Sequence, residues 1–169
     1  MAVRMLASAV VHEGKYAASF PMFGSERRGA PVAAFLRIDE KPIRERTQIY
    51  EPNCLIVVDP RLIETRAQDI FSGLKSSSTL VINASRAARE LYPPNVGVVG
   101  FVNATRIGID EIGTPVTNTC MMGAFAHTTG WLKLDSILES LSDNFSGTLL
   151  DKNVKCAKRG FEETIIIRV

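Results

Sequence analysis

The sequence has little of what most metal and nucleophilic sites are built from. Its 169 residues include three cysteines and two histidines. Cys54, Cys120 and Cys156 lie far apart and form no CxxC pair, so we expect no zinc site and no cysteine-ligated iron–sulfur cluster within this chain. Buried free thiols are the simpler interpretation. His127 lies in an apolar segment, where a hydrogen-bonded core residue is expected, and His12 lies near a helix end that tolerates a positive charge.

The sequence also lacks an excess of charge and a long apolar run. Twenty Lys and Arg against 18 Asp and Glu leave a net charge of +2, spread along the chain, which gives no electrostatic case for nucleic acid or membrane. The longest apolar runs, 96–102 and 164–167, are far below the roughly 18 residues of a membrane span. Residues 1–11 lack a cationic start and a cleavage site, so no signal peptide is expected. We therefore expect a cytoplasmic protein.

Familiar catalytic and nucleotide-binding motifs are absent as well. There is no GxGxxG after a strand, no GxxxxGK[ST], no HExxH and no GxSxG, and no Ser/His/Asp or Cys/His set has support in the sequence. A self-contained nucleotide-binding α/β protein is therefore disfavoured. The chain does not have the sequence of a complete catalyst.

The apolar pattern predicts an α/β fold in one domain, 1–169. Its length and its hydrophobic fraction of 46% suit one compact domain. Short strands are expected at 15–20, 32–38, 43–49, 55–58, 79–82 and 96–102, and helices at 2–12, 62–74, 85–91, 105–112, 118–129, 134–141 and 148–163. The order predicts an open, mostly parallel sheet with helices on both faces, an antiparallel strand pair around the turn 39–42, and a helical C-terminal third.

The densest polar cluster is a loop bounded by glycines. Its glycines permit positive φ and close approach of a partner, and its two arginines offer planar guanidinium groups that suit phosphate or carboxylate. Glu26 could orient either arginine. The alternative is a solvated turn between two strands. The residues of this candidate loop are Gly24, Ser25, Glu26, Arg27, Arg28 and Gly29.

A second polar cluster, 114–119, precedes an apolar helix. Asn118 or Thr119 could cap that helix and leave backbone N–H groups available for a contact at its start. The alternative is a capped core helix. The helix is rich in small residues, so we expect it to pack closely against another element, and Met121 and Met122 are expected to be packing residues.

Seven motifs occur in order along the chain. They are Gly14-Lys15-Tyr16-Ala17, the run from Phe20 to Val32 with its Glu26-Arg27-Arg28-Gly29-Ala30-Pro31 block, Phe35-x-Arg37-Ile38, Pro42-Ile43-Arg44, Val57-Val58-Asp59, Asn118-Thr119-x-Met121-Met122-Gly123-Ala124 and Lys158-Arg159-Gly160-Phe161-Glu162-Glu163. Together these motifs resemble the gamma subunit of pyruvate:ferredoxin oxidoreductase and, more broadly, the gamma domain of the 2-oxoacid:acceptor oxidoreductases. They cover nearly the whole chain, and the Glu-Arg-Arg-Gly-Ala-Pro block is quite specific.

The resemblance implies a subunit that is inactive alone. Enzymes of the family oxidatively decarboxylate a 2-oxoacid to an acyl-CoA and pass electrons to ferredoxin or a similar acceptor. Thiamine diphosphate, magnesium and the 4Fe-4S clusters are implied for the alpha, beta and delta subunits, with CoA as co-substrate, and no cofactor for this chain by itself. Organic electron-sink chemistry would then belong to the cofactor, and protein would supply placement.

Within that resemblance, the candidate loop is expected to face the substrate or CoA side of the assembly, or another subunit. Pyruvate is the favoured 2-oxoacid, with branched-chain and aryl (phenylglyoxylate-type) substrates as alternatives. A purely structural assembly module, whose loop touches no ligand, is the alternative from another functional class.

One departure from the family pattern concerns the N-terminus. The family opens with a strand and a Gly-rich Arg-Gly-Gly-Gln-Gly type of turn, whereas residues 1–6 enter directly at the first helix. We expect either that residues precede this start or that this form lacks the first strand. No role of that glycine turn transfers to this sequence, because no matching residues exist here.

Overall fold

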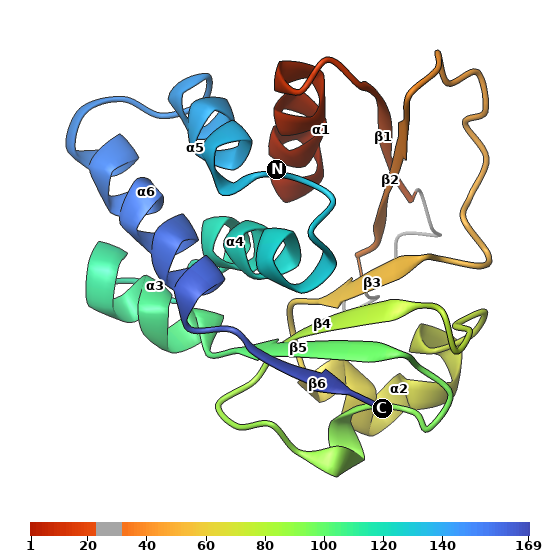
Figure 1. Cartoon of the computed structure of the whole chain (residues 1–169). Coiled ribbons are helices and arrows are strands. Elements are labelled where there is room, and N and C mark those ends of the chain that lie inside the picture. Colours follow the sequence, from red (N-terminus) through yellow and green to blue (C-terminus); the bar gives the residue numbers. More distant parts are fainter. Residues whose placement is uncertain (23–31) are drawn as a thin grey trace.

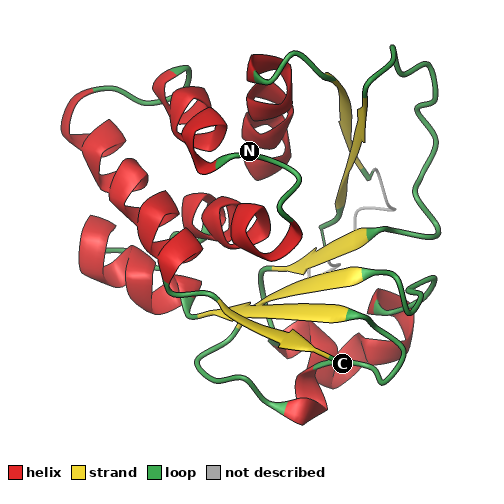
Figure 2. Ribbon diagram, in the orientation of Figure 1, coloured by secondary structure: helices red, strands yellow, loops and turns green. Residues whose placement is uncertain are grey.

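The computed structural model describes residues 1–22 and 32–169, which form helices packed on a sheet and on a separate two-stranded ribbon (Figures 1 and 2). The helices are α1 (Ala2–His12), α2 (Arg61–Ile70), α3 (Ala104–Ile112), α4 (Asn118–Thr129), α5 (Leu134–Ser142) and α6 (Gly147–Glu162), with a 3-10 turn η1 (Arg89–Leu91). The strands are β1 (Tyr16–Pro21), β2 (Ala34–Asp39), β3 (Cys54–Val57), β4 (Thr79–Asn83), β5 (Val98–Val102) and β6 (Ile165–Arg168). No helix of the described residues has the length and apolarity that a membrane crossing needs.

The main sheet has the order β3-β4-β5-β6, in which β3, β4 and β5 run parallel and β6 runs antiparallel to β5. Successive side chains of its central strands point alternately into two hydrophobic cores, one on each face of the sheet. Leu80 and Ile82 pack with Ile63 of α2, while Val81 packs with Met121 of α4. Helices therefore cover both faces (Figure 1), which confirms the predicted open α/β sheet.

Helix α4 crosses α6 at very close range, as its small residues predicted. A Cβ added to Gly123 would collide with the carbonyl oxygen of Ala157, and one added to Gly160 would collide with that of Cys120. The two glycines therefore allow the backbones to touch. Met122 is buried in the same region, as expected of a packing residue.

The antiparallel ribbon exists, but its strands differ from those predicted. Strand β1 pairs with β2, from Tyr16 opposite Asp39 to Pro21 opposite Ala34, so the connection between them is 22–33 rather than 39–42. The predicted strand 43–49 is absent. Pro42 cannot donate to a ladder, and Arg37 of β2 binds this segment through its side chain instead. We call residues 40–53 the strap.

Two further differences concern 85–91 and the C-terminus. The predicted helix 85–91 is reduced to the turn η1, because Ala88 before it has an extended backbone. The apolar run at 164–167 forms β6, an edge strand that the predicted sheet did not include, so the helical C-terminal third ends in a strand. Gly14 and Gly130 follow the ends of α1 and α4 with positive φ, which confirms both predicted helix stops.

Candidate functional site

The candidate loop, Gly24 to Gly29, lies outside the described residues. Its nearest described neighbours are Met22 and Val32, at the open end of the β1–β2 ribbon. The ribbon stays paired up to this point, because the Met22 N–H donates to the Ala33 carbonyl oxygen at 2.9 Å. Met22 is 43% exposed and Val32 is 92% exposed. This end of the ribbon therefore presents apolar side chains to solvent beside the predicted loop.

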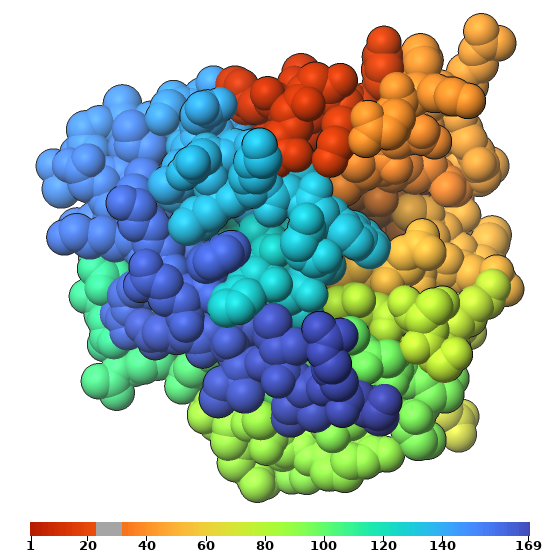
Figure 3. Space-filling model, in the orientation of Figure 1, coloured from red at the N-terminus to blue at the C-terminus, as the bar shows by residue number. Residues whose placement is uncertain are grey.

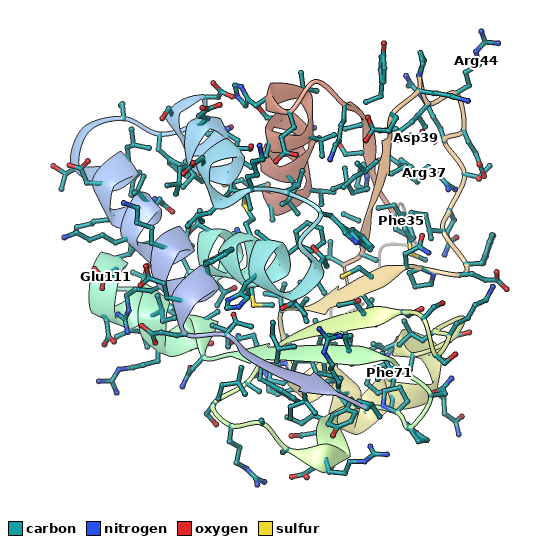
Figure 4. All side chains as sticks on the ribbon, in the orientation of Figure 1. Phe35, Arg37, Asp39, Arg44, Phe71 and Glu111 are labelled. Carbon is teal, nitrogen blue, oxygen red and sulfur yellow. The ribbon has the colours of Figure 1, made fainter. Side chains whose placement is uncertain are left out.

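The outer face of the ribbon is held to the strap by Arg37. One of its terminal nitrogens, Nη2, donates to Glu45 Oε1 and to the Thr47 carbonyl oxygen, both at 3.1 Å, and to Thr47 Oγ1 at 3.3 Å. Its Nε is buried and has no hydrogen-bond partner among the described residues. In Figure 4, Arg37 points from β2 toward the strap, whereas Arg44 of the strap points away from the ribbon. Arg37 therefore positions the element that carries the loop.

A shallow cavity of about 270 Å³ lies between the ribbon and the strap. Ala18 and Phe20 of β1 and Ile43 and Arg46 of the strap are among the residues that line it. The ring of Phe20 packs on that of Phe35, with 5.4 Å between centroids. This face thus combines apolar side chains with a guanidinium group, a composition that suits contact with a protein or an anionic ligand.

The second predicted cluster has a structural place. Thr117 is the N-cap of α4 and makes no side-chain cap, and Asn118 and Thr119 already lie in the first turn, so the predicted cap by either residue was wrong. Thr119 is buried, and its Oγ1 donates to Asn153 Oδ1 of α6 at 3.0 Å. Among the described residues, no hydrogen bond links Asn118 or Thr119 to the ribbon. The contact predicted for this helix start stays a prediction.

A junction that the sequence reasoning missed lies at the carboxyl ends of the parallel strands. Asn83, 5% exposed at the end of β4, donates from Nδ2 to the Val58 carbonyl oxygen and to Thr105 Oγ1, both at 2.9 Å. Its Oδ1 accepts from the Thr105 N–H at 3.3 Å. One amide thus ties β3, β4 and the start of α3 together. The one available signal was a polar residue directly after the apolar run 79–82.

A second cavity, of about 550 Å³, opens beside this junction, between α2 and the segment after β4. Ligands of open α/β sheets bind at the carboxyl ends of the strands. Its floor is apolar, with Ile63 and Leu91, and its rim carries Arg86 and Glu90, which pair with each other at 2.7 Å. Among the described residues that line this cavity, the Arg86 guanidinium is thus already paired with a carboxylate.

The histidines and cysteines do not form a catalytic set. His127 hydrogen-bonds through Nδ1 to the Phe161 carbonyl oxygen, and its ring stacks on the Phe161 side-chain ring. This confirms the expected hydrogen-bonded core histidine. His12 lies near two acceptors of α5, with Nε2 3.0 Å from Asp143 Oδ2 and Nδ1 3.6 Å from Glu139 Oε2. Neither ring is hydrogen-bonded to a thiol or hydroxyl, so no activated nucleophile arises among the described residues.

The three cysteines are free thiols, as expected, with Cys120 and Cys156 buried and Cys54 half-buried. Burial raises the pKa of Cys54 and of Cys120 to about 12 and also raises the pKa of Cys156. Thiols are poor ligands until deprotonated. The described residues also contain no group of three His, Cys, Asp or Glu side chains placed to hold a metal ion. The described residues therefore do not fit a metal ion or an iron–sulfur cluster.

Fold and site together define an α/β protein that presents an exposed ribbon end and strap, and whose described residues hold no complete catalytic set. The sequence model of the family described as pyruvate ferredoxin/flavodoxin oxidoreductase matches residues 1–163. The chain belongs to this family.

Relatives with assigned names agree with this family. The chain is 45% identical over 168 residues to the pyruvate/ketoisovalerate oxidoreductases common subunit gamma of Thermococcus kodakarensis, covering 98% of this chain and 90% of the relative. It is also 45% identical over 168 residues to the gamma subunit of the NADH-dependent phenylglyoxylate dehydrogenase of Aromatoleum evansii, covering 98% of this chain and 87% of that subunit.

A solved structure supports the same relationship. Subunit PORC of the pyruvate oxidoreductase of Thermotoga maritima superposes with a TM-score of 0.84 at 30% identity, and the match covers 98% of this chain and 89% of that one. The resemblance stated from the motifs is therefore confirmed.

Proposed function

We propose that this chain is the gamma subunit of a multisubunit 2-oxoacid:ferredoxin oxidoreductase and is inactive by itself. The complex converts a 2-oxoacid and CoA to an acyl-CoA and carbon dioxide and passes two electrons to ferredoxin. The observation that carries the proposal is the 45% identity to named gamma subunits along nearly the whole chain. The lack of a catalytic set among the described residues agrees with a supporting role.

The partners and cofactors of the proposal follow from the family. Alpha, beta and delta subunits, or fused equivalents, carry thiamine diphosphate with magnesium and the 4Fe-4S clusters, and the complex works in the cytoplasm. This chain contributes a surface. In the proposal, Arg27 and Arg28, oriented by Glu26, face CoA phosphates or carboxylates of a neighbouring subunit, because guanidinium groups suit both.

Pyruvate is the proposed 2-oxoacid, and a phenylglyoxylate-type substrate is the second candidate. The second candidate rests on one observation: the phenylglyoxylate dehydrogenase subunit is as similar to this chain as the pyruvate/ketoisovalerate subunit. The name of the latter, a common subunit, says that one gamma chain serves two oxidoreductases in that organism. We therefore assign substrate selectivity to the other subunits of the complex.

The first test is the native mass of the polypeptide, purified anaerobically from its own cells. We expect it to elute with larger subunits that contain iron and thiamine. The complex should reduce ferredoxin when given pyruvate and CoA, and a panel of branched-chain and aryl 2-oxoacids ranks the alternatives. Elution without such subunits would contradict the proposal. A complex that used phenylglyoxylate and not pyruvate would contradict only its substrate.

The second test addresses the candidate loop. Replacing Arg27 or Arg28 by Ala should raise the KM for CoA in the assembled complex by about ten- to a hundredfold, since losing one charged hydrogen bond costs roughly 1.5–3 kcal/mol. Arg66→Ala is the matched control, because Arg66 is an exposed arginine on α2, away from the ribbon and the strap, and forms no ion pair among the described residues. If the loop is only an assembly contact, the same variants weaken the complex and leave the KM of the surviving complex unchanged. If neither assembly nor CoA kinetics changes, the loop has no role in the site.

A further inference from the structure

The outer face of the ribbon, which turns away from α1, combines apolar and basic side chains. In the ladder, Ala18 of β1 lies opposite Arg37 of β2, and Phe20 lies opposite Phe35. Residues opposite each other point to the same face of a sheet, so these four side chains share one face. The side chain of Leu36, between Phe35 and Arg37, packs on α1 instead. The outer face is therefore not used by the core of the chain.

The outer face and the strap enclose the cavity of about 270 Å³ described above. Ala18, Phe20 and Ile43 give it apolar walls, and Arg46 is the charged residue among those described that line it. Pockets that enclose a whole small molecule usually measure roughly 300–1,000 Å³. In Figure 3, the orange atoms of the strap lie at the upper right border of the face shown, with no other element over them. The cavity thus suits one inserted side chain rather than a cofactor.

The charges of the strap leave an excess of positive charge beside this cavity. Two of its three acidic side chains, Glu45 and Glu51, are already held in ion pairs. The third, Glu40, forms no ion pair among the described residues. The three basic side chains of the strap form none there either, and they are Lys41, Arg44 and Arg46. Three basic groups against one acidic group favour a negatively charged partner.

A second guanidinium group at the cavity also has an unused donor. Arg37 lies directly opposite Ala18, which lines the cavity. Its Nη2 binds the strap, but its Nε is buried and finds no acceptor in the described part of the chain. Buried donors normally have a partner. Arg46 makes no hydrogen bond to any described residue, so two guanidinium groups retain donors at one place, and a carboxylate matches the geometry of a guanidinium group.

We propose that this cavity receives an acidic side chain of a neighbouring subunit, whose methylene groups lie against Phe20 and Ile43 and whose carboxylate binds Arg46. The inference rests on the proposed function, because it requires the other subunits of the complex. The excess of positive charge selects an acidic partner, and the apolar walls select one with a short hydrocarbon stem. The small volume and the exposed position of the strap favour a side chain from a neighbouring protein surface.

The first experiment measures the dissociation of this chain from the anaerobically purified complex, by gel filtration over a range of dilutions and salt concentrations. Arg46→Glu should raise the dissociation constant at least tenfold, because it replaces an attractive pair by two like charges. Arg46→Lys keeps the charge and should restore most of the association. Arg66→Glu is the matched control, since Arg66 is an exposed arginine of α2, away from the ribbon and the strap. It should leave the dissociation constant unchanged.

A second measurement remains valid if Arg46→Glu fails to fold. Arg46→Lys places an amine at the cavity, and a water-soluble carbodiimide joins an amine to a carboxylate that lies in contact with it. Treatment of the assembled complex should therefore link this position to an Asp or Glu of another subunit, which mass spectrometry of the linked peptides identifies. Arg66→Lys is the control for unspecific coupling and should give no such link.

Three results would overturn the proposal. The first is an assembled complex whose dissociation constant Arg46→Glu leaves unchanged. The second is a carbodiimide link from position 46 only to a carboxylate of this same chain. The third is an Arg46→Glu complex that stays assembled while its KM for the 2-oxoacid rises, which would assign the cavity to the free substrate anion. A wild-type chain that elutes without other subunits would contradict the proposed function itself, and this inference with it.

Discussion

Glu13 joins the first helix to the fifth, and its replacement gives the most quantitative prediction. It follows α1 and reaches the start of α5, where Oε1 accepts from the Lys133 N–H at 2.7 Å and from Ser136 Oγ at 2.9 Å. Its Oε2 lies 3.3 Å from Lys15 Nζ. The side chain is only 12% exposed. A carboxylate from a distant element thus supplies the cap that α5 lacks from its own N-cap residue, Lys133.

The size of the effect follows from the bonds that each variant keeps. Glu13→Ala leaves a backbone N–H and a hydroxyl without their acceptor, and bonds to a charged group contribute roughly 1.5–3 kcal/mol each. We expect Glu13→Ala to lower the free energy of unfolding by about 3 kcal/mol. Glu13→Gln keeps one acceptor oxygen but loses the charge, and should cost about half as much. The order Ala, Gln, wild type in rising stability is therefore expected.

The pH dependence separates the charge from the packing. Burial by itself would raise the pKa of Glu13, but hydrogen bonds from Lys133 and Ser136 and the nearby Lys15 outweigh it, so the pKa lies below the ordinary value of 4.5. A lowered folded pKa means that the stabilisation is complete above the unfolded pKa and is lost as pH falls through the folded one. The difference between wild type and Glu13→Gln should be constant near pH 7 and shrink below about pH 4.5.

The measurement is urea unfolding at pH 7 and pH 4, followed by the fluorescence of Trp131. This is the single tryptophan of the chain, and its carbonyl oxygen accepts from Lys15 Nζ at 3.4 Å, so it reports on this junction. Glu162→Gln, at an exposed position of α6, is the control and should change stability by less than about 0.5 kcal/mol. A Glu13→Gln difference that is equal at both pH values would refute the reasoning.

Two other positions give predictions of the same kind. Gly123→Ala should destabilise the chain by about 2 kcal/mol, since a Cβ would press on the Ala157 backbone and outweigh the roughly 1 kcal/mol gained in helix propensity; thermal unfolding checks this, and an unchanged or raised Tm would contradict it. Asn83→Ala should cost about 2–3 kcal/mol, because it leaves the Val58 carbonyl oxygen and the Thr105 N–H unpaired. Asn83→Asp keeps an acceptor for the Thr105 N–H but places a carboxylate oxygen opposite the Val58 carbonyl oxygen, so it should cost at least as much as Asn83→Ala. Hydrogen exchange of the Thr105 amide, which keeps its acceptor only in Asn83→Asp, distinguishes the two variants.

The helices were largely predictable because their signals are local. Residues 2–12 and 118–129 were placed at their observed bounds from apolar spacing and a following glycine. The small side chains of α4 predicted that it packs closely against another element. They did not indicate that this element is α6. The strands of the parallel sheet were found as short apolar runs between turn residues, since strands buried on both faces have few polar positions.

The pairing of strands was less predictable because it depends on residues far apart in sequence. The turn at 39–42 has good local chemistry, and Asp39 does accept from the Lys41 N–H at 3.1 Å. The ribbon nevertheless forms between β1 and β2, because Leu36 and Ile38 then bury one face against α1. Similarly, β6 pairs with a strand more than sixty residues earlier, which periodicity cannot indicate. The roles of Glu13 and Asn83 depend on contacts that are distant in sequence as well.

The placement of the candidate loop depends on a series of contacts that begins far from it. A two-stranded ribbon is marginally stable by itself, so β1 and β2 keep their position through α1, which packs on Ala17 and Leu36, and through Arg37, which binds the strap. Helix α1 in turn is fixed to α5 by Glu13. In the proposed subunit, a loosened α1 would therefore shift the ribbon end that carries Arg27 and Arg28. Glu13 affects only the position of the loop and does not itself contact the proposed ligand. Glu13→Gln should therefore raise the KM for CoA less than Arg27→Ala does, and it should lower the stability of the chain more.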